Sequence, residues 1–347
     1  MSDKIRRIEN SSFSDCYNLT IDNIPDSLEY IGDWAFSNCQ NLQLFTFPKS
    51  LTEIGYHAFY GCSKLKFVVI PQNVCFIGEG AFACCPNINS IDVHPQNKAY
   101  NSAYNCDAII DNNTKTLIAG CAKTSIPNNV LEIGNSSFMG CERLPDIYYI
   151  PENVKKIGDN AFNGCIFLRS VILHDDISHI GSFAFARCHS LCRISVPKKL
   201  KVINPQTFSG CSNLRSLEIS ESVERIDDFA FYDCDKLCTI IFPNKLIKLG
   251  QNIIGGRQSL SCVFVPHNYY NEYKNYFGKY NIAVEPNAIY TLSAFSAIFG
   301  NYRIVEFEEE YSLHFGDEIT VLFDYNSCMK IKESSDGNGN YNVTSVS

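Results

Sequence analysis

The chain has 347 residues, of which 45% are hydrophobic and 19% charged, and this balance excludes an intrinsically disordered protein. A formal net charge of -8 argues against nucleic acid or an anionic membrane surface as the main partner. The sequence has no run of about 18 apolar residues, so it predicts no insertion into a membrane.

A repeated unit of 23 residues organises most of the chain. Counted from a cysteine as position 0, it is C-x-x-L-x-x-I-x-I-P-x-x-V-x-x-I-G-x-x-A-F-x-x. A fixed period in the twenties with apolar residues at fixed offsets is typical of a solenoid. Nine copies are well preserved, and they begin at Cys16, Cys39, Cys62, Cys85, Cys141, Cys165, Cys188, Cys211 and Cys234.

Each unit has three segments. The L-x-x-I-x-I segment alternates as a short strand does, and the proline after it stands where no ladder donor is needed. The Ile-Gly pair, as in Ile54-Gly55, predicts a turn at which glycine takes a positive φ. The Ala-Phe pair, as in Ala58-Phe59, predicts a short helical or irregular arc whose phenylalanine fills the core between coils.

The chain begins and continues within this register. Ile5, Ile8 and Phe13 occupy repeat positions before Cys16, so we expect a longer precursor or a neighbouring chain to supply the cap that an open solenoid end needs. The fourth unit is interrupted at about 95–127. Asn112-Asn113-Thr114 lies there between two apolar runs and predicts a hairpin projecting from one coil, either carrying specificity or serving as a decorative loop.

The repeat decays toward its C-terminal end. A tenth unit has Arg257 in place of cysteine, and the polar and aromatic stretch 268–280 predicts a capping helix. We therefore expect a solenoid domain over 1–285, with a capping segment at about 267–285. Residues 286–347 alternate apolar and polar residues and predict a small separate β-rich module, with a loose tail from Ser334.

The cysteines favour a structural role. Seventeen are present, and the nine at the repeat position are expected to stack as a column of buried, reduced thiols, which favours a reducing compartment. In the C-x-x-x-C pairs that start at Cys188 and Cys234, the second cysteine lies on the strand and should diverge from the first, so we expect no zinc site. Cys84 is a candidate reactive thiol.

Signals of chemistry are otherwise lacking. The sequence has no nucleophile elbow, zinc-protease, phosphate-loop or dinucleotide motif, and its seven histidines have no recurring partner. We therefore expect no enzymatic activity, catalytic residue, metal or cofactor. The remaining enzymatic hypothesis, a reaction carried out by the region after Pro286, has only the acidic run Glu306–Glu310 to support it, and that run is typical of a solvated face.

The unit resembles the leucine-rich repeats of the BspA type, also called the Treponema pallidum-like class. The resemblance covers about residues 5–266, and the insert from Asn97 to Ile118 resembles the hairpin elaboration of that class. It implies a β-rich leucine-rich-repeat solenoid of about ten coils, with a parallel β-sheet and short arcs. Known members are bacterial and protist surface proteins implicated in attachment to host matrix and cells, so the resemblance implies an adhesin at the cell surface or secreted.

Outward-facing strand positions form the candidate protein-binding face. A solenoid gathers such positions into one broad surface, and apolar, aromatic and arginine side chains on it have the composition of an interface. Tyr148 and Tyr149 compete for one of these outward positions. In an alternative interpretation, the insert or the C-terminal module covers part of the face. The candidate residues are Thr46, Lys66, Phe67, Val69, Asp92, Tyr148, Arg169, Ile172, Arg193, Ser195, Arg215, Glu218, Ile241 and Phe264.

The leading hypothesis is thus non-enzymatic recognition of a protein, of the host surface or matrix if the resemblance extends to function. The alternative is an intracellular, cytoplasmic recognition or sensing module of a larger protein. The first residues, MSDKIRRIENSSF, lack the apolar core of a secretory signal and favour this alternative, as do reduced cysteines.

Overall fold

The computed structural model describes residues 4–21, 24–43, 46–256, 260, 262–278 and 283–287, and then the strand segments 301–303, 312–313, 322–324, 330–335 and 341–346. Most of these residues form a parallel-sheet β-solenoid of about eleven turns, which confirms the expected fold class. The chain divides into two compact units, described separately below. The first comprises Met1–Leu214, Ser220–Lys236 and Ile247–Gln258, and the second Arg215–Ile219, Leu237–Leu246 and Ser259–Ser347.

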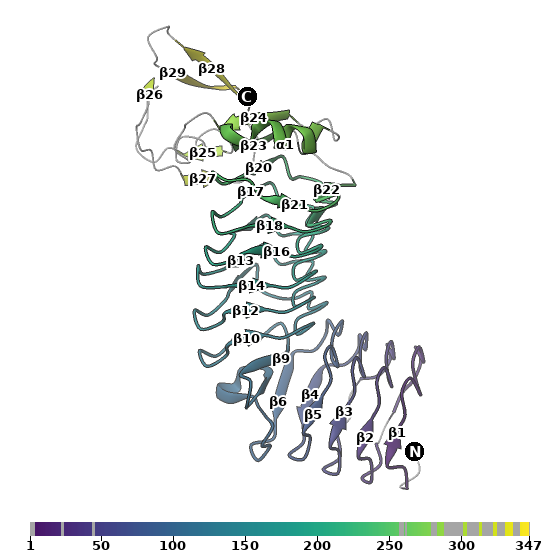
Figure 1. Ribbon diagram of the computed structural model, residues 1–347. Helices are drawn as coiled ribbons and strands as arrows, with labels where there is room; N and C mark the ends of the chain where they lie inside the picture. The colour runs from purple at the N-terminus through teal and green to yellow at the C-terminus, as the bar shows by residue number, and fades with distance from the viewer. Residues whose placement is uncertain are drawn as a thin grey trace. The chain divides into compact units, whose positions relative to one another are not determined.

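A row of two-residue strands runs through the first unit at the Ile-Gly position, where the sequence predicts a turn. The isoleucines of successive coils are direct partners, as in Ile8, Ile31, Ile54 and Ile77. The row forms parallel sheets (Figure 1) from β1 (Arg7–Ile8), β2 (Tyr30–Ile31), β3 (Glu53–Ile54) and β5 (Phe76–Ile77); from β10 (Glu132–Ile133), β12 (Lys156–Ile157) and β14 (His179–Ile180); and from β16 (Val202–Ile203), β18 (Arg225–Ile226) and β21 (Lys248–Leu249).

A second row of strands lies where the L-x-x-I-x-I segment predicts it. In β4 (Phe67–Ile70) the second and fourth residues are buried and the first and third exposed, as the alternation of side chains in a strand requires. In the first unit β4 pairs in parallel with β6 (Ser90–Val93). The remaining strands of the row form a parallel sheet of β11 (Ile147–Tyr149), β13 (Ser170–Ile172) and β15 (Arg193–Ile194).

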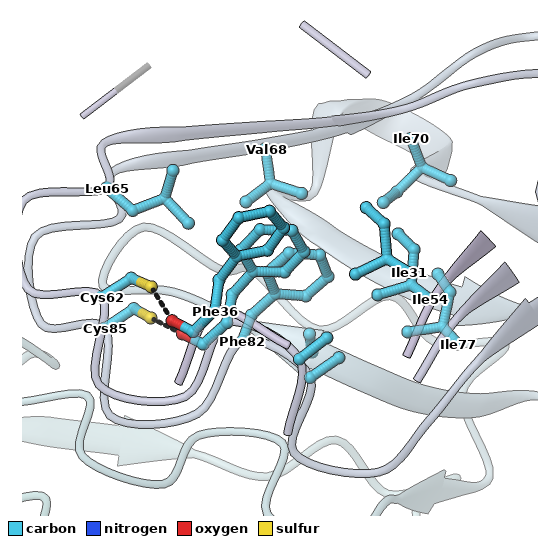
Figure 2. Packing of buried hydrophobic residues seen from close by; sticks show 14 of the residues in the cluster. Ile31, Phe36, Ile54, Cys62, Leu65, Val68, Ile70, Ile77, Phe82 and Cys85 are labelled. Carbon is cyan, nitrogen blue, oxygen red and sulfur yellow. Dashed lines mark hydrogen bonds between the residues drawn. The ribbon is translucent and has the colours of Figure 1, made fainter. Parts of the chain in front are cut away.

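Stacked phenylalanine rings fill the space between these strands, as the Ala-Phe pattern predicts. Phe36 and Phe59 stack at 5.3 Å between centroids, and Phe59 and Phe82 at 5.5 Å, with interplanar angles of 12° or less. Phe162 and Phe185 repeat the arrangement at 5.3 Å in later coils. Figure 2 shows Phe36 and Phe82 in this stack beside Ile31, Ile54 and Ile77. Ring stacking adds to the free energy that burial of each ring supplies.

Seven thiols of the cysteine column bond their coil to the preceding one. The Phe36 carbonyl oxygen accepts one hydrogen bond from the Cys39 N–H at 3.1 Å and another from the Cys62 thiol at 3.2 Å. The Cys85 thiol donates in the same way to the Phe59 oxygen, at 3.1 Å (Figure 2). Equivalent bonds from Cys39, Cys165, Cys188, Cys211 and Cys234 span 26 or 27 residues. The thiol thus satisfies part of a buried carbonyl group.

The glycine of the Ile-Gly pair has a different role from the expected one. Gly55 and Gly78 do not have positive φ; instead, a Cβ on Gly55 would lie 2.5 Å from the Asp33 backbone nitrogen, and one on Gly78 would lie 2.3 Å from the Tyr56 nitrogen. The reason is the close approach of the preceding coil, which leaves no room for a side chain. The positive φ angles occur two residues later, as at Trp34 and His57 (+57° and +53°).

The insert forms the expected hairpin, but the hairpin is built into the wall of the solenoid rather than projecting from it. β8 (Ala108–Asp111) and β9 (Thr116–Gly120) are antiparallel, and the Asp111 carboxylate accepts the turn N–H groups of Asn113 and Thr114. β9 then pairs in parallel with β10, so that Leu117 takes the place beside Ile133 that a coil strand would occupy. Leu117 is fully buried.

Asn97 attaches the beginning of the insert to the preceding coil. Its buried amide donates to the Pro71 and Val74 oxygens, and its Oδ1 accepts from the Tyr100 N–H at 2.8 Å. The segment continues through β7 (Tyr100–Asn101), which pairs with β8, and the 3-10 turn η1 (Ala103–Asn105). Asn97 Oδ1 also accepts from the Ala99 N–H at 2.9 Å. Both donor hydrogens and both acceptor sites of this amide are therefore used locally, so the insert is fixed where it enters.

The second unit contains a parallel sheet of β17 (Ser216–Glu218), β20 (Thr239–Ile241), β23 (Cys262–Pro266) and β24 (Ala283–Asn287). β24 extends the parallel ladder beyond the tenth predicted coil. Within the stretch that predicts a capping helix, the turn η2 (His267–Tyr269) leads into α1 (Tyr270–Phe277). Tyr273 and Phe277 are buried against Phe242, with ring centroids 4.7 and 5.7 Å away.

The described segments after residue 300 are antiparallel strands, in a region whose alternation predicts several strands. β25 (Asn301–Arg303) pairs with β27 (Leu322–Asp324), and β29 (Tyr341–Val346) pairs with β26 (Ser312–Leu313) and β28 (Lys330–Ser335). Within the tail that is expected to be loose, residues 341–346 form the strand β29. The acidic run Glu306–Glu310 lies outside the described residues.

The glycine geometry predicts the effect of a single methyl group. In Gly158→Ala the new Cβ would lie 2.4 Å from Asn135 Oδ1 and 2.7 Å from the Asn135 nitrogen. We expect the free energy of unfolding to fall by about 2–3 kcal/mol, as overpacking does, measured by urea denaturation. Gly278→Ala is the control, because no atom lies within 4 Å of its Cβ and φ is −57°. Equal stability of the two variants would contradict the close-approach explanation.

Candidate functional site

The outward residues of β4 and β6 form the first part of the candidate face. Phe67 and Val69 are 42% and 50% exposed, and Val69 lies opposite Asp92 on the neighbouring strand. Lys66, Asp92 and Thr46 are exposed as well. The structure therefore places these five candidates at the surface, with two large apolar side chains on one strand.

A second group of outward residues, on β11, β13 and β15, is more apolar. Tyr149 and Ile172 are direct partners and are 68% and 43% exposed, and Ile147 on β11 is 48% exposed. Arg169 comes directly before β13. Arg193, on β15, is the direct partner of Ser170 on β13. Both arginines are exposed. We call Ile147, Tyr149, Ile172, Arg169 and Arg193 the β11–β13 patch. Ser195, one residue after β15, is also exposed.

The ion pair of Arg169, a member of the β11–β13 patch, is weak. Arg169 Nη1 lies 3.8 Å from the Asp146 carboxylate, and both side chains are more than 60% exposed. A solvent-exposed pair at this distance contributes little to stability because water screens it. The guanidinium of Arg169 can therefore pair with an acidic group of a partner at small cost.

The expectation for Tyr148 is wrong. This residue is 5% exposed, its hydroxyl donates to the Thr124 oxygen at 3.0 Å, and its ring packs edge-on against Phe138 and Phe162. The unit that begins at Cys141 has one extra residue before the strand, and the parallel register pairs Tyr148 with the buried Val171. Side chains of a strand alternate between its faces, so Tyr149 takes the outward position instead. Burial raises the pKa of Tyr148.

The expected outward exposure is also wrong for two candidates in the second compact unit. Ile241 and Phe264 are only 8% and 5% exposed, although they occupy the outward position of β20 and β23. All three residues of β20 are buried, which is the pattern of a strand covered on both faces rather than one. Of the other two candidates in this unit, Glu218 is exposed and Arg215 is half-buried.

The thiols of the column do not have the lowered pKa of a reactive nucleophile. Burial raises the pKa of Cys39 to about 11 and those of Cys141, Cys188 and Cys234 to about 12, which keeps these thiols protonated. Burial also raises the pKa of Cys84, which is half-buried. A thiol activated as a nucleophile has a lowered pKa, so Cys84 does not have that character.

The described residues provide no grouping for metal chemistry. In that part of the chain, no three or more His, Cys, Asp and Glu side chains are placed to hold a metal ion. The second cysteine of each C-x-x-x-C pair donates to the main chain of the preceding coil, Cys192 to Arg169 and Cys238 to Arg215. Also in the described residues, none of the helices is long and apolar enough to cross a membrane.

Two surface features are missed by the sequence reasoning. Tyr149 and Ile147 could have been found by counting the extra residue of the Cys141 unit into the strand register. The other feature is a cluster of Trp34, His57 and Tyr60 on the arcs of the units that begin at Cys16 and Cys39. Its signal was present as aromatic residues at equivalent positions of successive repeats.

Comparisons with known proteins agree with the repeat fold. The model of the BspA type leucine-rich repeat region matches residues 1–110, 117–216 and 201–293 with six copies. A leucine-rich repeat protein from Eubacterium ventriosum has a similar structure, with 25% identity and a TM-score of 0.58, covering 76% of this chain and 73% of that one. No curated protein is significantly similar in a search of that group.

Two further solved structures show the same fold. A leucine-rich cell surface protein from Faecalibacterium prausnitzii has 23% identity and a TM-score of 0.54, covering 85% of this chain and 72% of that one. The pneumococcal vaccine antigen PcpA has 22% identity and a TM-score of 0.56, covering 76% of this chain and 60% of that one.

The burial of the thiols predicts their reactivity. With iodoacetamide in native buffer, we expect rapid alkylation of Cys16 and Cys75, which are exposed, and protection of Cys188 and the other buried column cysteines until denaturant is added. Labelling of the buried group should be at least about 1000-fold slower, because it requires unfolding of a coil. Peptide mass spectrometry gives the rate at each site, and labelling of Cys188 as fast as Cys75 would refute the assignment.

Proposed function

Because the chain belongs to the BspA-type leucine-rich repeat family, we propose that it is a non-enzymatic scaffold that recognises a protein partner through the outward face of its parallel sheets. The observation that carries this proposal is the β11–β13 patch. Large exposed apolar side chains next to arginines have the composition of an interface centre.

The energetics of the patch fit this role. Tyr149 and Ile172 are exposed on regular strands, so little conformational entropy of the backbone is lost when a partner covers them. Complete burial of one such side chain is worth about 1.5–3 kcal/mol. Arg169 and Arg193 at the edge of the apolar residues favour a partner surface with acidic groups around an apolar centre.

For the cellular setting, we propose adhesin-like display at the cell surface or secretion, with host or matrix proteins as partners. Among proteins with this fold are a bacterial cell surface protein and a pneumococcal vaccine antigen. Those descriptions concern the proteins that carry them and supply the direction of the proposal. The competing proposal is an intracellular recognition module, favoured by the free state of all fifteen cysteines that the structure describes in detail.

The sheet face can be tested with a double variant. Tyr149→Ser with Ile172→Ser should weaken binding to a partner protein at least about tenfold, because two side chains at the centre of the interface are lost. Immobilised chain is titrated with purified matrix proteins and with solubilised surface proteins by biolayer interferometry. Leu131→Ser is the matched control, since Leu131 is 49% exposed but lies outside the face.

A charge-reversed variant separates affinity from folding in the same assay. Arg193→Glu should slow association and reduce its dependence on salt, with an unchanged melting temperature, because Arg193 is exposed. Equal binding by the wild type and the Tyr149→Ser, Ile172→Ser variant would move the binding site elsewhere on the molecule.

The cellular setting has its own test. Intact source cells are treated with protease, and released peptides are identified by mass spectrometry. Surface display predicts peptides from residues 24–256 before lysis. Protection of all of these peptides until lysis, while a known surface protein is cleaved, would eliminate adhesion and leave the intracellular recognition module.

A further inference from the structure

A small stack of aromatic rings stands on the arc side of the first unit, on coils that do not contribute to the β11–β13 patch. The Trp34 and His57 rings stack with centroids 4.2 Å apart and an interplanar angle of 27°, and Tyr60 contacts Trp34 at 5.7 Å. Trp34 is 41% exposed. On the far side of His57 lies Gly80, where a Cβ would be 2.4 Å from the imidazole ring. The stack is therefore closed at its Gly80 end.

The opposite end of the stack is open. Trp34 and His57 occupy the same position in successive units, and Tyr60 follows His57 by three residues. We call the coil before Cys16 the first coil, so that Trp34 lies in the second coil and His57 in the third. In the first coil the same two positions hold Ser11 and Ser14. The Ser11 N–H donates to the Asp33 oxygen at 2.8 Å, which places Ser11 beside Trp34 in the next coil. The indole thus has two rings on one side and two serines on the other.

Serines in place of aromatic residues leave space on the side of the indole that faces the first coil. Successive coils are about 4.8 Å apart, which is also close to the separation of stacked rings. At these two positions the third coil has the rings of His57 and Tyr60, whereas the first coil has only the hydroxymethyl side chains of Ser11 and Ser14. Ser11 is exposed, and the Ser14 hydroxyl donates to the exposed Asp15 carboxylate at a long 3.4 Å. A flat apolar floor is therefore bordered by hydroxyl and carboxylate groups.

We propose that Trp34 is the stacking platform of a glycan-binding site that takes one pyranose ring over the serines of the first coil. The axial C–H groups of a β-gluco-configured sugar carry partial positive charge and face the negative π surface of the indole. Its equatorial hydroxyls lie around the rim, where Ser11, Ser14 and Asp15 offer hydrogen-bonding groups. Asn38, whose amide donates to Asp15 Oδ1 at 2.8 Å, holds that carboxylate in place.

A cationic ligand fits the geometry less well. Quaternary ammonium groups are bound by several aromatic faces that surround the charge. Here His57 and Tyr60 contact Trp34 from the neighbouring coil on the same side, so of these three rings only Trp34 offers an open face. The exposed Tyr17 reaches the rim through its hydroxyl, which donates to Asp15 Oδ1 at 3.5 Å. A single flat face with polar groups at its edge is the arrangement that suits a sugar.

The experiment uses the fact that Trp34 is the only tryptophan of the chain. The full chain is titrated with cellotriose and with chitotriose, and the tryptophan emission is recorded. We expect a saturable change with a dissociation constant on the order of 1 mM, as befits one stacked ring and a few hydrogen bonds. Ser14→Tyr should abolish the change, because its ring fills the space as Tyr60 does in the third coil. Ser209→Tyr, at the same repeat position in a distant coil, should leave it intact.

The outcomes that overturn the proposal are distinct. An emission that does not saturate with either sugar up to about 20 mM excludes a site of the expected strength. A saturable response to tetramethylammonium instead of the sugars assigns the platform to cations. Unchanged sugar binding in Ser14→Tyr, with an unchanged melting temperature, places the sugar elsewhere. The Tyr149→Ser, Ile172→Ser variant should bind the sugars as the wild type does, so this test is independent of the protein-binding face.

Discussion

Contact between successive coils at the spacing of one β-strand is the constraint on which the rest of the structure depends. Neighbouring strands lie about 4.8 Å apart, and every repeated residue must be compatible with its own copy at that distance. Phenylalanine satisfies the condition by parallel stacking, at 5.1 Å between Phe138 and Phe162 for example. The Ile-Gly glycine satisfies it by having no side chain at all where the backbones meet.

The cysteine column follows from the same constraint. A carbonyl such as that of Phe36 already accepts a bond within its own coil, and the small thiol of the next coil reaches its second acceptor site. The raised pKa of the buried thiols keeps the donor proton in place. Cohesion therefore comes from repeated nearest-neighbour contacts, which is how solenoids are generally stabilised.

The same uniformity leaves the outward positions free to differ. Along the outer face of the second strand row the residues include Val69, Asp92, Tyr149, Ile172 and Ser195, which share neither size nor charge. The insert also separates the pair β4–β6 from the sheet β11–β13–β15, so the outward residues of the first unit form two groups rather than one continuous row. The proposed recognition surfaces thus consist of positions that stacking does not constrain, on the strands and on the arc.

By itself the sequence determined the period, the inward residues and the fold, because stacking demands the same residue types at fixed offsets and so makes them visible as a repeat. The tertiary structure alone decided three other features. Register turned Tyr148 inward and Tyr149 outward, since one added residue reverses the faces of a strand. Close approach of backbones, rather than turn geometry, explained Gly55. Covering of both faces of β20 removed Ile241 from the surface, because burial depends on residues distant in the sequence.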